Sequence, residues 1–332
     1  ADRIGRYPDV AALGALVHAL AGDEPGSDRW AAVLFAPRDG ADKGELSYIG
    51  RLLRAILARD GTRQMRADAA AVREAPSQHE WLPSALGLEA FSYLWEGDVD
   101  RADALFAQAA AAGEWFLGLP AATLALACRA MIAIERGDWE TGDELVDRSQ
   151  RLIGEHGLDR YLTSGLSYAV TTRCAAHRGD LVRARRLLAE AATIRPLLTT
   201  ATPGISVQTL LEMARAHSDL SDVAGARVVL REASDILAKR PDLGVLARQR
   251  DEIRQRIGTL VTSAVGASAL TAAELRLLPW LATHLSFPEI GDRLHVSRHT
   301  VKTQAMSIYR KIDASSRSEA VRRATELGLL AG

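Results

Sequence analysis

Cysteine and long apolar runs are scarce in this sequence of 332 residues. Its two cysteines, Cys128 and Cys174, lie within apolar helical patterns, and we expect buried free thiols in a reducing compartment. The best candidate for a membrane span, LPAATLALACRAMIAI, is interrupted by Arg129, and the first residues lack the charged and then apolar pattern of a signal peptide. These absences predict a cytoplasmic protein that does not interact with a membrane.

Motifs for catalysis and for metal binding are also missing. The histidines are scattered and show no metal-ligand spacing. The segment GDWETGDE at Gly137 has the glycine spacing of a phosphate-binding loop, but Asp143 and Glu144 stand where that loop needs Lys and Ser or Thr, and they would repel phosphate. We therefore predict no enzymatic activity, no cofactor and no metal site.

An internal repeat fills the middle of the chain. The phrases GDVDRA, GDWETG, GDLVRA and SDVAGA begin 40, 42 and 42 residues apart, and small or apolar residues recur at fixed offsets from each. The repeated positions begin at Gly97, Gly137, Gly179 and Ser221. Glycine can adopt the left-handed conformation that ends one helix, and the following aspartate can cap the next helix. Since Ser221 replaces glycine in the last copy, we expect that turn to be built differently.

Each repeat is expected to be a helical hairpin that cannot bury its apolar face alone, so neighbouring hairpins stack. The alanine- and leucine-rich composition favours helices as well. We predict an all-α protein in which a solenoid of helical hairpins occupies residues 9–262. Two degenerate hairpins are expected before the clear copies, at 10–20 with 28–35 and at 45–59 with 63–73.

A second domain is predicted at residues 270–332, after a linker at 263–269 that is small and uncharged. Helix-start signatures occur at Thr271, Ser286, Ser297 and Ser316, three of them followed by a glutamate that can complete a capping box. They predict four short helices at 271–284, 286–294, 297–312 and 316–327, the last closed by Gly328. The two-residue turn between the second and third helices is typical of a helix-turn-helix unit.

The third of these helices carries a one-sided charge. Residues 297–311 contain four Lys or Arg and no Asp or Glu, whereas the whole chain has a net charge of −1. On a helical wheel Val301, Ala305, Ile308 and Ile312 share a face that must pack inward, and His299, Thr303, Met306 and Arg310 lie opposite, with Lys302 and Ser307 beside them. An outward face with cations and no acid favours a helix that enters the major groove of DNA.

This segment resembles the LuxR/GerE-type DNA-binding domain over essentially its whole length. The shared elements are Leu270-Thr271, Glu274, Leu278, Ser286-x-x-Glu289-Ile290, Leu294, Val296-Ser297, Thr300-Val301-Lys302, Ile308, Arg310-Lys311 and Arg317-x-Glu319-Ala320. His284 and Asp313 stand where the family usually has glycine, and Gln304 stands where histidine is common. Met306 replaces a residue that is often polar or basic, so the target sequence cannot be inferred.

The resemblance implies roles for the residues of the third helix. Lys302, Thr303 and Met306 match base-facing positions, and His299 lies on the same face. Arg298, Thr300, Arg310 and Lys311 are expected phosphate contacts, together with Ser307. The fourth helix often pairs two such modules, so we expect a homodimer on double-stranded DNA.

The hairpin region resembles tetratricopeptide repeats, with the longer period of MalT-type regulators. Regulators of that type carry an ATPase domain ahead of their repeats; this sequence has no such motif, so it is either part of a longer regulator or a shorter relative. Tyr93, Trp95, Tyr161 and Tyr168 are expected mainly in the core, and as an alternative they could line a groove for a small-molecule or protein effector.

Together these features predict a transcriptional regulator whose helical repeats control a sequence-specific DNA-binding module. Two alternatives stay open. The chain could be a protein-interaction scaffold with weak or vestigial DNA binding, or the C-terminal part of a larger, signal-dependent ATPase.

Overall fold

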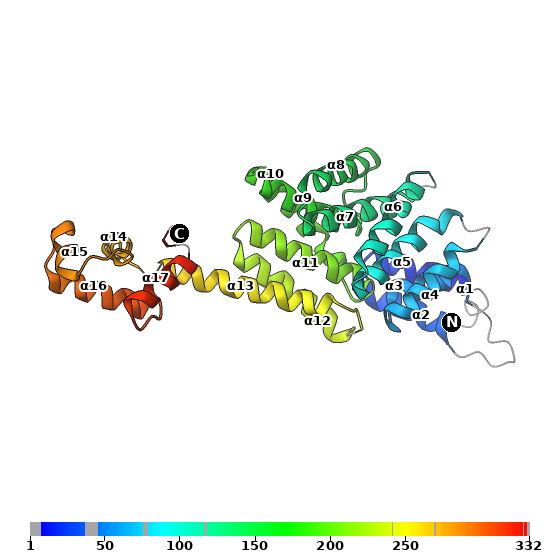
Figure 1. Ribbon diagram of the computed structural model, residues 1–332. Coiled ribbons are helices and arrows are strands. Elements are labelled where there is room, and N and C mark those ends of the chain that lie inside the picture. The colour runs from blue at the N-terminus through cyan, green and yellow to red at the C-terminus, as the bar shows by residue number, and fades with distance from the viewer. Residues whose placement is uncertain are drawn as a thin grey trace. The chain divides into compact units, whose positions relative to one another are not determined.

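The computed structural model describes residues 8–36, 46–75, 79–115, 118–240, 242–268, 270–327 and 329–330. The chain divides into two compact units, residues 1–254 and 255–332. Across the described ranges it has 17 α-helices and no strand, which confirms the all-α prediction (Figure 1). Within the same ranges no helix is both long and apolar enough to cross a bilayer.

The first unit consists of six helical hairpins, including the two degenerate ones. Short 3₁₀ turns at His79–Trp81 (η2) and Arg195–Leu197 (η3) precede the third and sixth hairpins. The hairpins are α1 (Pro8–Leu20) with α2 (Glu24–Phe35), α3 (Tyr48–Leu57) with α4 (Gly61–Arg73), α5 (Leu82–Glu96) with α6 (Val99–Trp115), α7 (Leu119–Glu135) with α8 (Trp139–His156), α9 (Ser164–His177) with α10 (Leu181–Ile194), and α11 (Pro203–Asp219) with α12 (Val223–Lys239).

The four repeated turns share one conformation. Gly97, Gly137 and Gly179 have φ angles of 93°, 81° and 79°, and Ser221 has 59°, so the expectation of a different turn at Ser221 was wrong. The aspartate that follows each of them accepts a hydrogen bond from the backbone N–H three residues later, at 2.9–3.2 Å. The serine therefore adopts a left-handed backbone that a residue with a Cβ rarely takes.

A further copy of this turn joins the first hairpin. Gly22 has a φ of 74°, and Asp23 accepts from the Gly26 N–H at 3.0 Å. Its other carboxylate oxygen lies 2.8 Å from His18 Nδ1, and the last hairpin repeats this contact between His217 and Asp222, also at 2.8 Å. The sequences HALAGDEPG and HSDLSDVAG have the same spacing. This copy lies outside the 40–42-residue period of the other turns and was therefore not predicted.

Small residues at the repeated offsets allow the paired helices to approach closely. The positions five and twelve residues after each turn are fully buried or nearly so; they are Ala102, Gly142, Ala184 and Ala226, and Ala109, Ser149, Ala191 and Ala233. Eight residues after the turn the pattern is less regular: Leu105 and Leu145 are only half-buried, and the next residues, Phe106 and Val146, are fully buried instead. The position nine residues after the turn is therefore buried in all four copies, and α10 and α12 bury the position eight residues after it as well.

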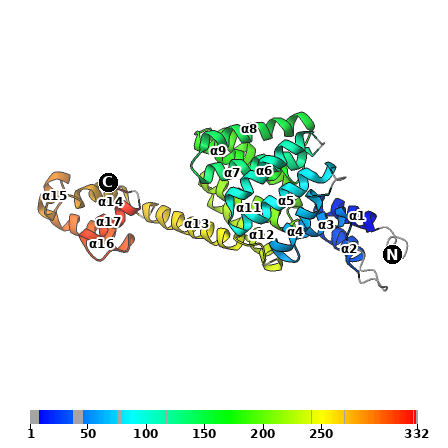
Figure 2. The ribbon, with the colours of Figure 1, turned by 45° about the vertical axis from the view of Figure 1, so that its right-hand side comes forward.

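The end of the last hairpin returns to the first three hairpins. Lys239 of α12 lies 3.4 Å from Glu24 of α2, and the Val245 N–H donates to the Trp95 carbonyl at the end of α5 at 2.8 Å. Helix α11 lies between α7 and α12 in both views (Figures 1 and 2) and contacts α3 and α9. The hairpins thus wind far enough for the chain to meet its own beginning.

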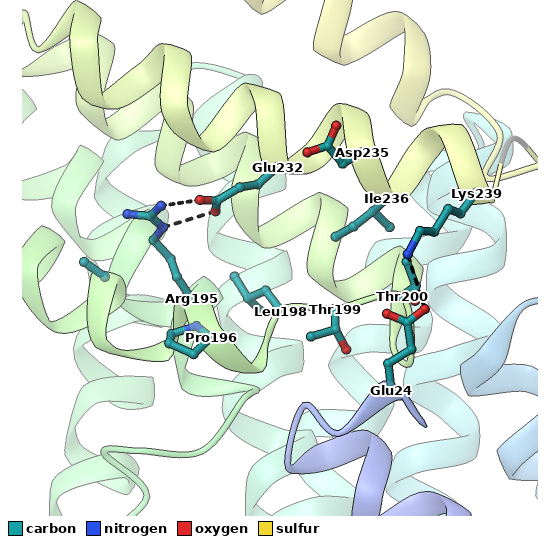
Figure 3. A pocket seen from close by; sticks show the side chains of 11 residues that line it. Glu24, Arg195, Pro196, Leu198, Thr199, Thr200, Glu232, Asp235, Ile236 and Lys239 are labelled. Carbon is teal, nitrogen blue, oxygen red and sulfur yellow. Dashed lines mark hydrogen bonds and ion pairs between the residues drawn. The ribbon is translucent and has the colours of Figure 1, made fainter. Parts of the chain in front are cut away.

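A cleft of about 490 Å³, lined by both charged and apolar side chains, marks this seam (Figure 3). Glu24 and Lys239 face each other across one end, and the Thr200 side chain also hydrogen-bonds to Glu24. At the other end the Arg195 guanidinium donates two hydrogen bonds to Glu232. The seam is therefore closed by charged and hydroxyl groups, in contrast to the apolar contacts inside each hairpin.

The predicted linker does not form a separate segment. Helix α13 (Leu246–Ser268) includes residues 263–268, and residue 269 lies outside the described residues. Residues 263–268 are therefore helical instead of forming a separate linker. The division between the units falls inside this helix, after Arg254, rather than at 262.

One substitution tests the close packing at the centre of the repeats. A Cβ atom on Gly204 of α11 would lie 2.0 Å from the Trp95 ring. We expect Gly204→Ala to lower the free energy of unfolding by about 1–3 kcal/mol because the indole would have to move within a packed core. The matched control is Gly87→Ala in α5, whose Cβ would meet no atom within 4 Å. It should gain about 0.5–1 kcal/mol from helix propensity. Urea denaturation followed by circular dichroism measures both, and similar values for the two variants would contradict this packing.

Candidate DNA-binding surface

Four helices form the C-terminal module, and the residues predicted to cap them do so. The helices are α14 (Ala272–Leu281), α15 (Phe287–Leu294), α16 (Arg298–Lys311) and α17 (Arg317–Glu326), with Thr271, Ser286, Ser297 and Ser316 as their N-caps. Helix α14 ends three residues earlier than predicted. The predicted stop at Gly328 lies outside the described residues.

In two of the three predicted capping boxes the glutamate accepts a hydrogen bond from the backbone N–H of the N-cap residue, as expected. Glu274 accepts from the Thr271 N–H at 2.6 Å, and Glu289 accepts from the Ser286 N–H at 2.7 Å. Glu319 differs, because its carboxylate accepts from the N–H and the hydroxyl of Ser315, at 2.8 and 2.6 Å, instead of from the N-cap residue. At the start of α17 the glutamate therefore binds the residue before the N-cap, whereas the glutamate of a capping box binds the N-cap residue itself.

Helix α16 is oriented as its sequence predicts. Val301, Ala305 and Ile308 are fully buried and Ile312 is 4% exposed. They pack in one apolar cluster with side chains of the other helices of the module, among them Leu277, Leu278 and Leu281 of α14, Ile290 of α15, and Ala320 and Ala324 of α17. The opposite side of α16 therefore faces outward.

A glycine fixes the turn that joins α15 to α16. His295 has a φ of 55°, and the Val296 N–H donates to the Gly291 carbonyl at 2.9 Å. A Cβ on Gly291 would lie 2.6 Å from the Val296 carbonyl oxygen, so a larger residue would push the turn away from α15. The sequence analysis did not single out this position; a glycine within a short helix was the available signal.

The two positions that depart from family glycines behave differently. Asp313 has a φ of 54°, which explains why glycine suits this position, and aspartate tolerates the left-handed region better than most residues. Its carboxylate also lies 3.4 Å from Arg323. His284 is not among the described residues with positive φ, so no backbone requirement for glycine exists there.

The outward side of α16 carries the predicted base-facing residues. His299, Lys302, Thr303 and Met306 are all exposed, as are Arg298 and Arg310, and Met306 is 57% exposed. We call these six residues the recognition face. Within the described part of the chain, none of their side chains makes a hydrogen bond or an ion pair. The recognition face is therefore free to meet an external partner.

Three of the expected phosphate contacts are placed differently. Lys311 Nζ lies 2.6 Å from Glu274 Oε2, and the Ser307 side chain hydrogen-bonds to the same carboxylate. The Thr300 hydroxyl lies 2.8 Å from that of Ser297. Lys311 and Ser307 are directed into the module because a nearly buried carboxylate must be paired, whereas the Thr300 hydroxyl pairs with that of the N-cap residue. Lys311 and Ser307 thus have a structural role that the sequence analysis did not foresee.

The pKa of the Glu274 carboxyl lies well below its ordinary value. Burial by itself would raise the pKa of this carboxyl, but hydrogen bonds from Lys311, from the Thr271 backbone and from Ser307 outweigh it and lower the pKa to about 2. The side chain is only 5% exposed. The pair joins the start of α14 to the end of α16 and so fixes the depth at which α16 sits in the module.

Arg317 fixes the start of α17. Its guanidinium donates to four backbone carbonyls after or at the end of α14, at 2.7–3.1 Å; these belong to Trp280, Leu281, Thr283 and Leu285. Carbonyls at a helix C-terminus lack partners within the helix and carry partial negative charge, so a cation is favourable there.

The four aromatic residues proposed for an effector groove do not form one. Trp95 is 1% exposed and donates to Gln208 at 3.3 Å, and Tyr168 is 5% exposed, with a pKa that burial and nearby Asp159 raise to about 12. Tyr93 lies between the guanidinium groups of Arg66 and Arg101, at 4.7 and 4.5 Å. Tyr161 is 46% exposed and lines a separate cavity. The burial of Trp95 and Tyr168 agrees with the expectation that these aromatic residues lie mainly in the core.

The cysteines match their prediction of burial. Cys128 and Cys174 are free and buried, and burial raises the pKa of both thiols, that of Cys174 to about 12. Among the described residues there is no group of three or more His, Cys, Asp or Glu side chains that could hold a metal ion.

The fold and the exposed cationic helix define a four-helix, helix-turn-helix DNA-binding module. Residues 268–324 match the family described as bacterial regulatory proteins, luxR family (GerE). The C-terminal unit therefore contains a LuxR-family domain, and the general function is that of a DNA-binding transcriptional regulator. The match does not extend to the repeat unit.

Other comparisons add little. No curated protein matches the chain. Among solved structures, the crystal structure of BtubC (BKLC) from P. vanneervenii is 16% identical and covers 71% of this chain and 91% of that chain, with a TM-score of 0.36. Similarity at this level carries no argument about fold or function.

The ion pair between Glu274 and Lys311 predicts that the stability of the C-terminal module falls in acid. Because the folded pKa of Glu274 lies below its ordinary 4.5, its contribution to stability is present above pH 4.5 and is lost as the pH falls towards 2. That contribution is up to about 3 kcal/mol, and Glu274→Gln should remove much of it at pH 7. Hydrogen exchange of α14 and α16 peptides in urea, at pH 3 and pH 7, measures the loss.

The control for this variant is Glu289→Gln, which changes an exposed capping carboxylate of the same module. It should accelerate exchange much less than Glu274→Gln does. Equal effects would show that the ion pair with Lys311 is not what stabilises the module.

Proposed function

We propose that α16 enters the major groove of double-stranded DNA and that the repeat unit controls this binding. The observation that supports it is the recognition face: its side chains are exposed and uncommitted, three of them are cations, and it contains no acid. Cations at this position neutralise phosphates and release counterions. Side chains between them can contact base edges.

The proposed contacts follow the geometry of the helix. Lys302 and Thr303 would hydrogen-bond to base edges, and the exposed thioether of Met306 suits the methyl group of thymine. His299, one turn earlier, faces the bases as well. Arg298 and Arg310, at opposite ends of α16, are the proposed phosphate contacts, with the Thr300 hydroxyl as a further donor.

We also propose that two copies bind a symmetric site through α17. The exposed residues of this helix are Ser318, Arg322, Thr325 and Glu326, whereas Val321 and Leu327 are partly buried against the core. A polar outer face supports an association that is weak in solution and is completed on DNA, because little apolar area is left to drive it. No membrane is involved in the proposal.

The second part of the proposal is that an effector controls DNA binding by acting on the repeat unit. The likeness to MalT-type regulators suggests a small-molecule or protein effector, which would have to bind two states of the protein with different affinity. The presence of an ATPase domain elsewhere in a longer protein is compatible with the same role.

Lys302 gives the sharpest test of DNA recognition. Genomic fragments bound by the full chain are first selected, and affinities for one of them are then measured at several salt concentrations. If Lys302 meets a base, Lys302→Ala should weaken binding by about 1–3 kcal/mol and relax the preference at one base pair. If it meets a phosphate, binding should weaken on all sequences and the salt slope should fall by about one.

Arg276→Ala is the charge-matched control, since Arg276 is exposed on α14 rather than α16. Its effect on affinity should be small. Absence of binding by the full chain, even at low salt, would instead favour the scaffold function.

A further inference from the structure

Helix α1 exposes an apolar stripe on its outer side. Its exposed residues are Asp9, Val10, Leu13, Val17 and Leu20, of which only the aspartate is polar. The four aliphatic residues are 36–65% exposed. Among the described residues, no other helix exposes more than two large apolar side chains. A surface helix normally turns a polar face outward, so an apolar outer face indicates that another surface covers it.

The stripe is not needed for packing inside the repeat unit. Helix α1 lies at the end of the stack of hairpins in both views (Figures 1 and 2). It packs on α2 and α3 through its inner side, where Ala11, Ala12 and Ala15 are fully buried. The stripe lies on the opposite side of the helix and is therefore available to another molecule.

The spacing of the stripe is that of a seam between two helices. Val10, Leu13, Val17 and Leu20 follow one another at intervals of three, four and three residues. This is the a and d pattern of a coiled coil, in which valine at a and leucine at d favours pairs of helices. The pattern is also self-complementary. In a parallel pair each residue meets its own copy, and in an antiparallel pair centred on Ala15 every valine meets a leucine.

The charge of α1 argues against other kinds of partner. The helix contains no Lys or Arg, the residues with which an interfacial helix binds lipid headgroups. Asp9, in the first turn, is the one charged residue of the outer side, so a charged peptide would find little to complement it. The surface that suits the stripe is an uncharged apolar helix of the same length, and a second α1 has these properties.

We propose that the stripe on α1 is a docking surface for the same stripe of a second copy of this chain. Its four side chains leave roughly 100–250 Å² of apolar surface exposed on each copy. A pair therefore stays below the total of about 1,200 Å² that a stable interface buries, and the association is weak and reversible.

Self-association through α1 would bring two DNA-binding modules together. The polar outer face of α17 leaves little apolar area for pairing, and α1 supplies such an area on the repeat unit. Joining two copies raises the effective concentration of the second module at a symmetric site. This role in DNA binding rests on the proposed function, whereas the self-association stands on the stripe alone.

Sedimentation velocity of the full chain without DNA measures the association. We expect a monomer–dimer equilibrium with a dissociation constant on the order of one to tens of micromolar. Val17→Lys should raise this constant at least about tenfold, because the ammonium would be buried without a partner. Val182→Lys is the matched control, since Val182 is 80% exposed on α10, and it should dimerise as the wild type does. Circular dichroism checks that both variants are folded.

Variants of opposite charge test whether α1 meets α1. Val17→Lys is mixed with Val17→Glu, which it would face in a parallel pair, and separately with Leu13→Glu, which it would face in an antiparallel pair. One of the two mixtures should associate at least about tenfold more tightly than its components do alone, because opposite charges then meet. Recovery in neither mixture would overturn the proposal.

Two further results would overturn it. A chain that stays monomeric up to about 0.1 mM would assign the stripe to a different partner protein. Equal effects of Val17→Lys and Val182→Lys would place the interface elsewhere.

The role in DNA binding is measured separately, on a selected symmetric fragment. Val17→Lys should bind it at least about tenfold more weakly than the wild type does. Equal affinity would overturn this role and leave the self-association standing. Absence of DNA binding by the wild type would contradict the proposed function, and the sedimentation result would be unaffected.

Discussion

Five of the six helical hairpins and two turns of the C-terminal module share one local constraint: where one helix ends and the next begins, a left-handed residue is followed closely by a side chain that caps the next helix. In the repeat unit the pair is Gly22-Asp23 or its equivalent, and the cap comes directly after the turn. In the C-terminal module His295 and Asp313 are left-handed, and Ser297 and Ser316 cap two or three residues later. The two arrangements differ in the number of residues between the left-handed residue and the cap.

Buried charge is the second common feature of the two units. In the module, Glu274 is held by Lys311, and in the repeats Glu212 is fully buried and lies 2.9 Å from Arg173. Arg173 also lies 3.0 Å from Glu135, so it joins α9 to α11 and to α7. Removing one partner of such a pair leaves an uncompensated charge and typically costs about 3–5 kcal/mol. These pairs therefore fix which helices are neighbours, whereas the small residues fix how closely they approach.

The sequence was sufficient for features that depend on neighbours in the chain. The turns at Gly97, Gly137 and Gly179, the caps of α14 to α17, and the inward face of Val301, Ala305 and Ile308 all follow from local patterns. The roles of individual residues on α16 were less accessible. Lys311 and Arg310 are adjacent and equally basic, yet Lys311 is engaged by a carboxylate 37 residues away and Arg310 is exposed. No periodicity encodes that contact.

The contacts between the early hairpins and the end of the repeat unit could not be predicted from the sequence either. Trp95 was expected mainly in the core, but its partners could not be predicted: Gln208, 113 residues later, accepts its N–H, and the chain before α13 adds a backbone contact to the same residue. The early hairpins therefore contact the exit of the repeat unit directly. An open solenoid tolerates gain or loss of an internal repeat, because each repeat touches only its neighbours. This one does not have that freedom: deleting a hairpin would leave Glu24 and Lys239 unable to meet, so its repeat number is fixed by geometry.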